Sequence, residues 1–73
     1  MARLIHPVVK KRYDSGELWL FRGQYFQAYI FSDGVVQLFP SDKEGRRLSV
    51  VCLNSFNGDD YEGAVRWLNE NVE

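Results

Sequence analysis

The side chains best suited to chemistry are few in this chain, and they lie far apart along it. The only histidine, His6, precedes Pro7, and the only cysteine, Cys52, lies in an apolar run with Val51 and Leu53. A structural zinc site takes four ligands drawn mainly from histidine and cysteine, so these two residues cannot form one. The apolar neighbours of Cys52 predict a small buried side chain rather than a reactive thiol.

Carboxylates and hydroxyls are more numerous, but their spacing does not match a catalytic or metal-binding motif. Asp59, Asp60 and Glu62 lack the alternating oxygen ligands and the glycine turn of a calcium loop, and helix capping explains them better. No serine lies in a nucleophile elbow, and the isolated glycines Gly58 and Gly63 do not form a phosphate-binding loop. We therefore expect no enzymatic activity, no metal, no cofactor and no small-molecule substrate.

The length and composition predict one small domain with an aromatic core. The chain has 73 residues, of which 45% are hydrophobic, and it contains two Trp, four Tyr and five Phe. A chain this short buries only about 60% of the surface that its unfolded form exposes, so its core must be dense. Aromatic side chains supply that density, and disordered chains are poor in them. We expect residues 1–73 to form a single domain.

The N-terminal sequence predicts the compartment. Its apolar stretch is too short for a signal peptide, and the usual small-residue cleavage site is missing. A single cysteine cannot form an intrachain disulfide, so the chain is unlike the disulfide-rich secreted domains. We expect a cytoplasmic protein that does not contact a membrane.

Turn signals at short intervals separate runs of β-branched and aromatic residues, a pattern typical of successive antiparallel strands. After Gly58 the period changes, and a set of apolar residues falls at helical spacing. Asp59 with Glu62 resembles a capping box at the start of this helix. The predicted fold class is α+β, an antiparallel meander of about five strands, open or curled into a half-barrel, with one C-terminal helix packed on one face. The expected strands lie near residues 4–12, 17–22, 25–32, 35–39 and 46–53, and the apolar helix residues are Tyr61, Ala64, Val65, Leu68 and Val72.

Two turns fix the predicted register of the sheet. Asp33-Gly34 suits a type I′ turn and Gly23-Gln24 a type II′ turn, so that Phe31 pairs with Val36 and Arg22 with Tyr25. The face without charge is expected to seat the helix, because Ala28 allows close approach. This face carries Trp19, Phe21, Phe26, Ala28, Ile30, Val35, Gln37 and Phe39, and the other carries Leu18, Leu20, Arg22, Tyr25, Gln27, Tyr29, Phe31, Val36 and Leu38.

The face opposite the helix mixes polar and aromatic side chains, as a partly solvated surface does. It has three possible uses: burial under a curled sheet with the N-terminal strand as a lid, binding of a protein or a second copy, or stacking of nucleic-acid bases. Our leading hypothesis is a non-enzymatic binding module, a small adaptor, inhibitor or regulator of a protein partner. Tyrosine and arginine dominate interface energies. The predicted contact residues are Arg22, Tyr25, Gln27 and Tyr29.

The alternative hypothesis is a nucleic-acid-binding domain that uses the same face with two basic clusters, Lys10-Lys11-Arg12 and Arg46-Arg47. The charge is unevenly distributed, because residues 1–56 hold eight basic and five acidic side chains and residues 57–73 hold one and five. Over about residues 17–72, the order of three strands and a helix resembles the layout of AP2-type and integrase-arm DNA-binding domains, without a diagnostic motif. The net charge of −1 differs from the basic character of most DNA binders.

Overall fold

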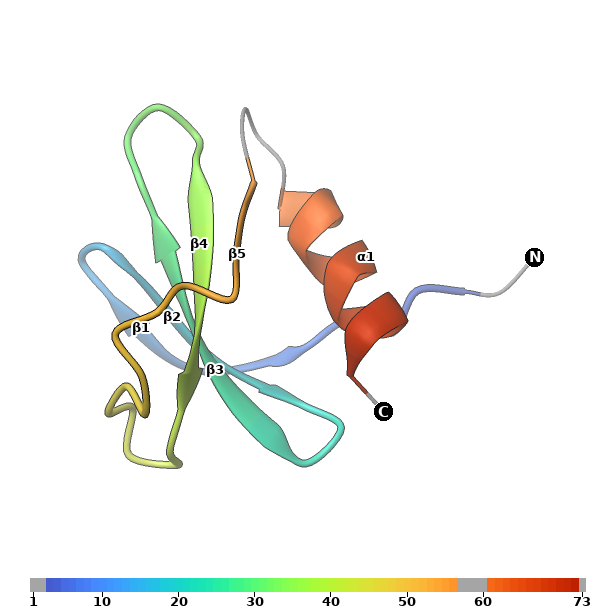
Figure 1. Ribbon diagram of the computed structural model, residues 1–73, viewed down its shortest axis with the longest axis horizontal. Helices are drawn as coiled ribbons and strands as arrows, with labels where there is room; N and C mark the ends of the chain where they lie inside the picture. Colours follow the sequence, from blue (N-terminus) through green and yellow to red (C-terminus); the bar gives the residue numbers. More distant parts are fainter. Residues whose placement is uncertain (1–2, 57–60, 73) are drawn as a thin grey trace.

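The computed structural model describes residues 3–56 and 61–72 of the chain. Five strands form one antiparallel sheet in sequence order, and a single helix packs against it (Figure 1). The predicted α+β meander is confirmed, and the sheet does not close into a barrel. No helix in the described part of the chain is long and apolar enough to cross a membrane. The elements are β1 (Val8–Tyr13), β2 (Gly16–Phe21), β3 (Gln24–Ile30), β4 (Val36–Ser41), β5 (Asn54–Phe56) and α1 (Tyr61–Asn71).

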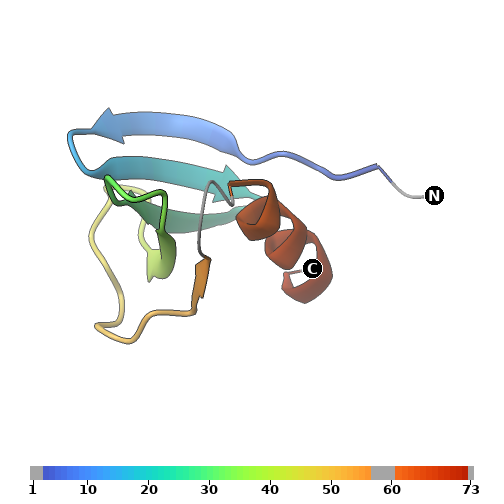
Figure 2. The same cartoon turned by 90° about the horizontal axis from the view of Figure 1, so that it is seen from above.

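The main core lies between α1 and one face of the sheet. Its members from β2 and β3 are those predicted for the helix seat, and Ala28 lies there with Ala64. Leu68 and Trp19 are completely buried, whereas Tyr61 at the start of α1 stays 39% exposed. Seen from above, α1 and the long connection between β4 and β5 lie at opposite ends of the molecule (Figure 2). The buried cluster consists of Trp19, Phe21, Phe26, Ala28, Val36, Leu38, Ala64, Leu68 and Val72.

The turn between β2 and β3 lies one residue earlier than predicted. Arg22 has a φ of 49° and Gly23 a φ of 79°, and positive φ at both central residues is the requirement of a type I′ turn. Tyr25 consequently pairs with Leu20 instead of Arg22. This correction shifts the register by two residues, so the side chains of β2 and β3 keep their predicted faces.

The turn between β3 and β4 is one residue longer than predicted, and this changes the faces. Gly34 donates its N–H to the Phe31 carbonyl, and Phe31 donates its own to Val35, which closes a three-residue loop. Gly34 takes the left-handed position of that loop, with a φ of 90°. Ile30 therefore pairs with Val36, and every β4 side chain moves to the face opposite its predicted one.

The predicted first and last strands need correction at their ends. The backbone N–H and C=O of Ile5 both bond to the Asn69 side chain at 2.9 Å, which ties the segment before β1 to α1 rather than to a strand. The predicted strand 46–53 is irregular apart from one bridge of Arg47 to Ser41, and β5 covers only Asn54–Phe56. The predicted cap at Asp59 lies outside the described residues.

The packing of α1 predicts a large loss of stability for Leu68→Ala. Leu68 is fully buried in the core, so truncation should lower the free energy of unfolding by about 2–4 kcal/mol. Chemical denaturation followed by circular dichroism measures this difference. Glu70→Ala on the exposed side of the same helix is the control and should change stability by less than about 0.5 kcal/mol. Equal effects of the two substitutions would contradict the described packing.

Candidate functional site

The structure separates Arg22 from the other three predicted contact residues. Its guanidinium donates to the carbonyl of Val72 at 2.6 Å and lies 5.1 Å from the centre of the Phe21 ring. A cation at the carboxyl end of a helix is favourable because of the helix dipole. Arg22 thus binds the end of α1, on the helix side of the sheet, and does not join Tyr25 and its neighbours in one surface. Its partner lies 50 residues away, so no local sequence signal could have identified this role.

The opposite face of the sheet is covered by the chain itself, through residues 42–47. Gln27 is only 8% exposed, and its side-chain amide donates to the carbonyl of Gly45. Gly45 has a φ of 91°, and a Cβ atom there would lie 2.5 Å from the Tyr13 hydroxyl. Burial beneath the N-terminal strand was one of the three uses considered for this face; the structure covers it with the connection after β4 instead. Gln27 is therefore a buried anchor for this loop.

Arg47 completes the cover over the aromatic part of the same face. Its guanidinium lies 5.3 Å from the centre of the Tyr29 ring and 4.7 Å from that of Phe39. The two rings meet edge to face, with their centres 5.2 Å apart. Contacts of a guanidinium with aromatic rings contribute about 0.5–2 kcal/mol each. One member of the predicted Arg46-Arg47 cluster is thus engaged within the fold, and Tyr29 is half-buried beneath it.

Asp42 shapes the turn that begins this cover. One carboxylate oxygen accepts the backbone N–H of Arg46 at 2.9 Å and that of Glu44 at 3.0 Å. The N–H of Arg46 is the largest influence on the carboxyl, and despite an opposing desolvation effect the pKa of Asp42 lies below its ordinary value of 3.8. The ionised carboxylate therefore holds residues 42–46 in a compact turn against the sheet.

The second basic cluster, Lys10-Lys11-Arg12, lies on β1 at the edge of the sheet. All three side chains are exposed, and the strand has a bulge between Val9 and Lys11. The guanidinium of Arg12 lies 3.3 Å from the carboxylate of Glu17 on β2. A surface hollow of about 220 Å³ is lined by Val9 and the three basic residues. The contact between Tyr13 and Gly45 brings the end of β1 next to the 42–47 loop.

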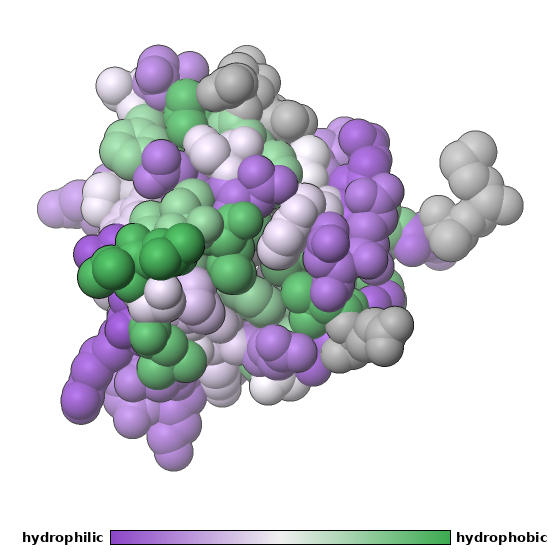
Figure 3. Space-filling view, in the orientation of Figure 1, coloured by the Kyte–Doolittle hydropathy of each residue, from purple (hydrophilic) through white to green (hydrophobic). Residues whose placement is uncertain are grey.

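The most exposed apolar residues lie in a segment that the sequence predicted to be a strand. We call residues 48–53 the apolar loop, and Figure 3 shows apolar side chains gathered over this part of the surface. Leu48 donates its N–H to Pro40 at 2.9 Å and Leu53 to Leu38 at 2.7 Å, so both ends are fixed on β4. The exposed fractions are 67% for Leu48, 86% for Val50, 68% for Val51 and 41% for Leu53. Sequence reasoning missed this surface, because the same run fits a buried strand.

Cys52 lies within the apolar loop but points less outward than its neighbours. It is half-buried rather than fully buried as predicted. Its Sγ lies 2.9 Å from the carbonyl of Asn54, while the N–H of Val51 donates to the Ser49 hydroxyl at 3.0 Å. These local bonds restrain the backbone of the loop.

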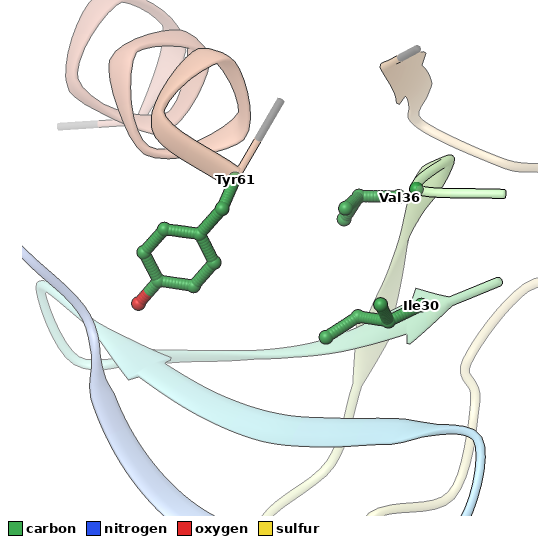
Figure 4. Close-up of a pocket in the computed structure, with 4 residues that line it drawn as sticks. Ile30, Val36 and Tyr61 are labelled. Carbon is green, nitrogen blue, oxygen red and sulfur yellow. The ribbon is translucent and has the colours of Figure 1, made fainter. Parts of the chain in front are cut away.

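A second hollow lies where α1 meets the β3–β4 hairpin (Figure 4). It has a volume of about 170 Å³ and is lined by Ile30, Gly34, Val36 and Tyr61. The Tyr61 ring packs edge-on against Trp19, with centres 5.3 Å apart. Burial, and then the charge of Glu17, raise the pKa of the Tyr61 hydroxyl. This hollow has the size and character to receive one apolar side chain.

Comparisons with protein-family models, with curated proteins and with solved structures find no match. The functional argument therefore rests on the chemistry of the described surfaces. Among these, the apolar loop is the surface whose side chains are most exposed against their preference for burial.

Asp42 predicts an acid-sensitive 42–47 loop. Its pKa is lower in the folded state, so its stabilising effect is complete above the ordinary pKa of 3.8 and is lost as the pH falls through the lowered value. Amide exchange at Glu44 and Arg46, corrected for its intrinsic pH dependence, should accelerate over that interval. Asp42→Asn keeps the acceptor oxygen without a charge and should remove this acceleration. An unchanged acid response in Asp42→Asn would show that another group is responsible.

Proposed function

We propose that this chain is a non-enzymatic protein-binding module, a small adaptor, inhibitor or regulator, and that the apolar loop is its main contact surface. The observation that carries the proposal is the exposure of Leu48, Val50 and Val51, at 67%, 86% and 68%, in a chain whose other large side chains are mostly packed. Exposed apolar patches on small domains usually mark sites of interaction. The proposed setting is cytoplasmic, an inference that comes from the sequence.

The geometry of the apolar loop favours tight binding for its size. Burying a valine side chain contributes about 1.5 kcal/mol or more, and Val50 and Val51 at the tip have most of their surface available. Both ends of the loop are fixed on β4, so less conformational freedom is lost when a partner binds. Valine side chains are stiff, which lowers that cost further.

Tyr29 and Arg47 form a polar border next to the apolar loop. Arg47 directly precedes Leu48 in the chain and stacks on Tyr29, which remains half-exposed. Protein interfaces are enriched in aromatic residues and arginine, and they surround an apolar centre with a polar rim. Tyr29 therefore keeps a role in the proposed interface, whereas Gln27 serves the fold and Arg22 lies with the helix.

The decisive variant is Val50→Ser with Val51→Ser. Peptides selected from a displayed random library for binding to the wild-type protein should lose at least about tenfold in affinity for it, because two buried valines contribute more than 1.4 kcal/mol together. Both side chains are solvent-exposed, so the melting temperature should hardly change. Tyr25→Ser with Tyr29→Ser is the matched comparison. If only the tyrosine variant weakened binding of the selected peptides, the interface would lie on the sheet face, and this result would contradict the proposal for the apolar loop.

Nucleic-acid binding is the second candidate function. It is supported by the contact of Tyr13 with Gly45, which brings the Lys10-Lys11-Arg12 strand next to the loop that carries Arg46-Arg47. Two of these cations already have partners, since Arg12 pairs with Glu17 and Arg47 stacks on aromatic rings. A phosphate ligand would have to compete with these contacts.

Salt dependence distinguishes the two candidates. A nucleic-acid binder loses affinity steeply as salt rises, because each neutralised phosphate releases counterions. Single-stranded and duplex oligonucleotides titrated at low and at moderate salt should show no binding if the protein-binding proposal holds. Salt-sensitive binding that Lys10→Ala with Lys11→Ala abolishes would instead establish the second candidate.

A further inference from the structure

The outer edge of β1 is open. The strand pairs only with β2, and in the described part of the chain no other strand or loop bonds to its far side. Five of its six residues are exposed. Every edge strand presents a row of N–H and C=O groups to solvent, and an extended segment of another chain can bind there by adding a strand.

The side chains of β1 define what such a segment must carry. The strand reads VVKKRY and contains three cations and no acid. Lys11 pairs with Leu18 and Arg12 with Glu17, so these cations lie on opposite faces of the sheet. Lys10 lies at the bulge between Val9 and Lys11, and it lines the hollow of about 220 Å³. An added strand would meet positive charge on both of its faces.

We propose that β1 binds an extended acidic segment of a partner protein by strand addition. Backbone hydrogen bonds along the open edge would hold the segment. Its carboxylates would pair with Lys10 and Lys11 and would compete with Glu17 for Arg12. Opposite charges across paired strands are stabilising. The inference rests on the proposed protein-binding function but uses a surface other than the apolar loop, so each can fail without the other.

The same charges argue against a second copy of this chain as the occupant. Antiparallel pairing of two β1 strands would bring the Lys10-Lys11-Arg12 run of one copy close to that of the other, and like charges placed opposite each other are destabilising. Lysines on edge strands commonly prevent uncontrolled pairing in this way. The edge lysines disfavour pairing with a neutral or basic strand, and they favour pairing with an acidic one.

The test uses the whole chain and three synthetic peptides of equal length. The first alternates glutamate pairs with valine and threonine, the second has the same charge but proline at alternate positions, and the third replaces glutamate by lysine. The acidic peptide should bind and should slow amide exchange along β1. The proline peptide lacks every second backbone N–H, the set that would face β1, and should bind at least about tenfold more weakly. The lysine peptide should not bind.

Charge reversal on the strand provides the matched variant. Lys10→Glu with Lys11→Glu should weaken the acidic peptide by about tenfold or more and should allow the lysine peptide to bind. Arg66→Glu reverses a charge on the exposed side of α1 instead of on β1 and should leave both affinities nearly unchanged. Circular dichroism and thermal melting verify that the variants fold.

Three results would overturn the proposal. Equal binding of the acidic and proline peptides would show attraction between charges without strand addition. Protection of amides elsewhere than on β1 would place the site on another surface, and stronger binding of an oligonucleotide than of the acidic peptide would show that the edge selects phosphate. Val50→Ser with Val51→Ser should not alter binding of the acidic peptide. A failure of the apolar loop as an interface can therefore be distinguished from a failure of strand addition at β1.

Discussion

The hydrogen bond from the Gln27 amide to the Gly45 carbonyl secures the face of the sheet that the helix leaves uncovered. A chain of 73 residues with one helix can bury only one sheet face against it, yet Leu18 and Phe39 on the other face are 1% and 5% exposed. The 42–47 loop supplies the missing cover. A buried amide without a partner costs about 1–3 kcal/mol, and moving the loop away would leave the Gln27 amide without one. The hydrogen bond therefore holds the loop against the sheet.

The apolar loop follows from this arrangement. Once residues 42–47 have crossed the sheet face, the chain returns to β4, where Leu48 and Leu53 bond to the carbonyls of Pro40 and Leu38. These two acceptors are separated by one residue on β4, while four residues separate the two donors. The additional residues between the donors cannot pair with β4. Ser49–Cys52 therefore bulge outward, as the extra residue of a β-bulge does on a smaller scale. The exposure of Val50 and Val51 is thus a consequence of covering the far face.

The sequence was sufficient for the elements whose signals are local. Helical spacing identified α1, and alternation placed Trp19 and Phe26 on the helix face, as the structure confirms. The sequence was insufficient where the length of a turn decides the register. Gly34 suits a two-residue loop or a three-residue loop, and the longer loop moves Val36 and Leu38 into the main core. The candidate surfaces depend on long-range contacts that periodicity cannot reveal. The apolar loop even has the composition of a strand.

The order of the meander keeps the two proposed binding surfaces apart. β1 forms one edge of the sheet, and β5, next to the apolar loop, forms the other. The two edges avoid uncontrolled pairing by different means: β1 is charged and bulged, whereas β5 is only three residues long. A long apolar edge strand would present free backbone hydrogen-bonding groups and apolar side chains at one site, and such a site is prone to aggregation. Because the valines lie outside the ladder and the cations lie on the opposite edge, the proposed apolar contact and the proposed acidic strand would use different surfaces and would not compete.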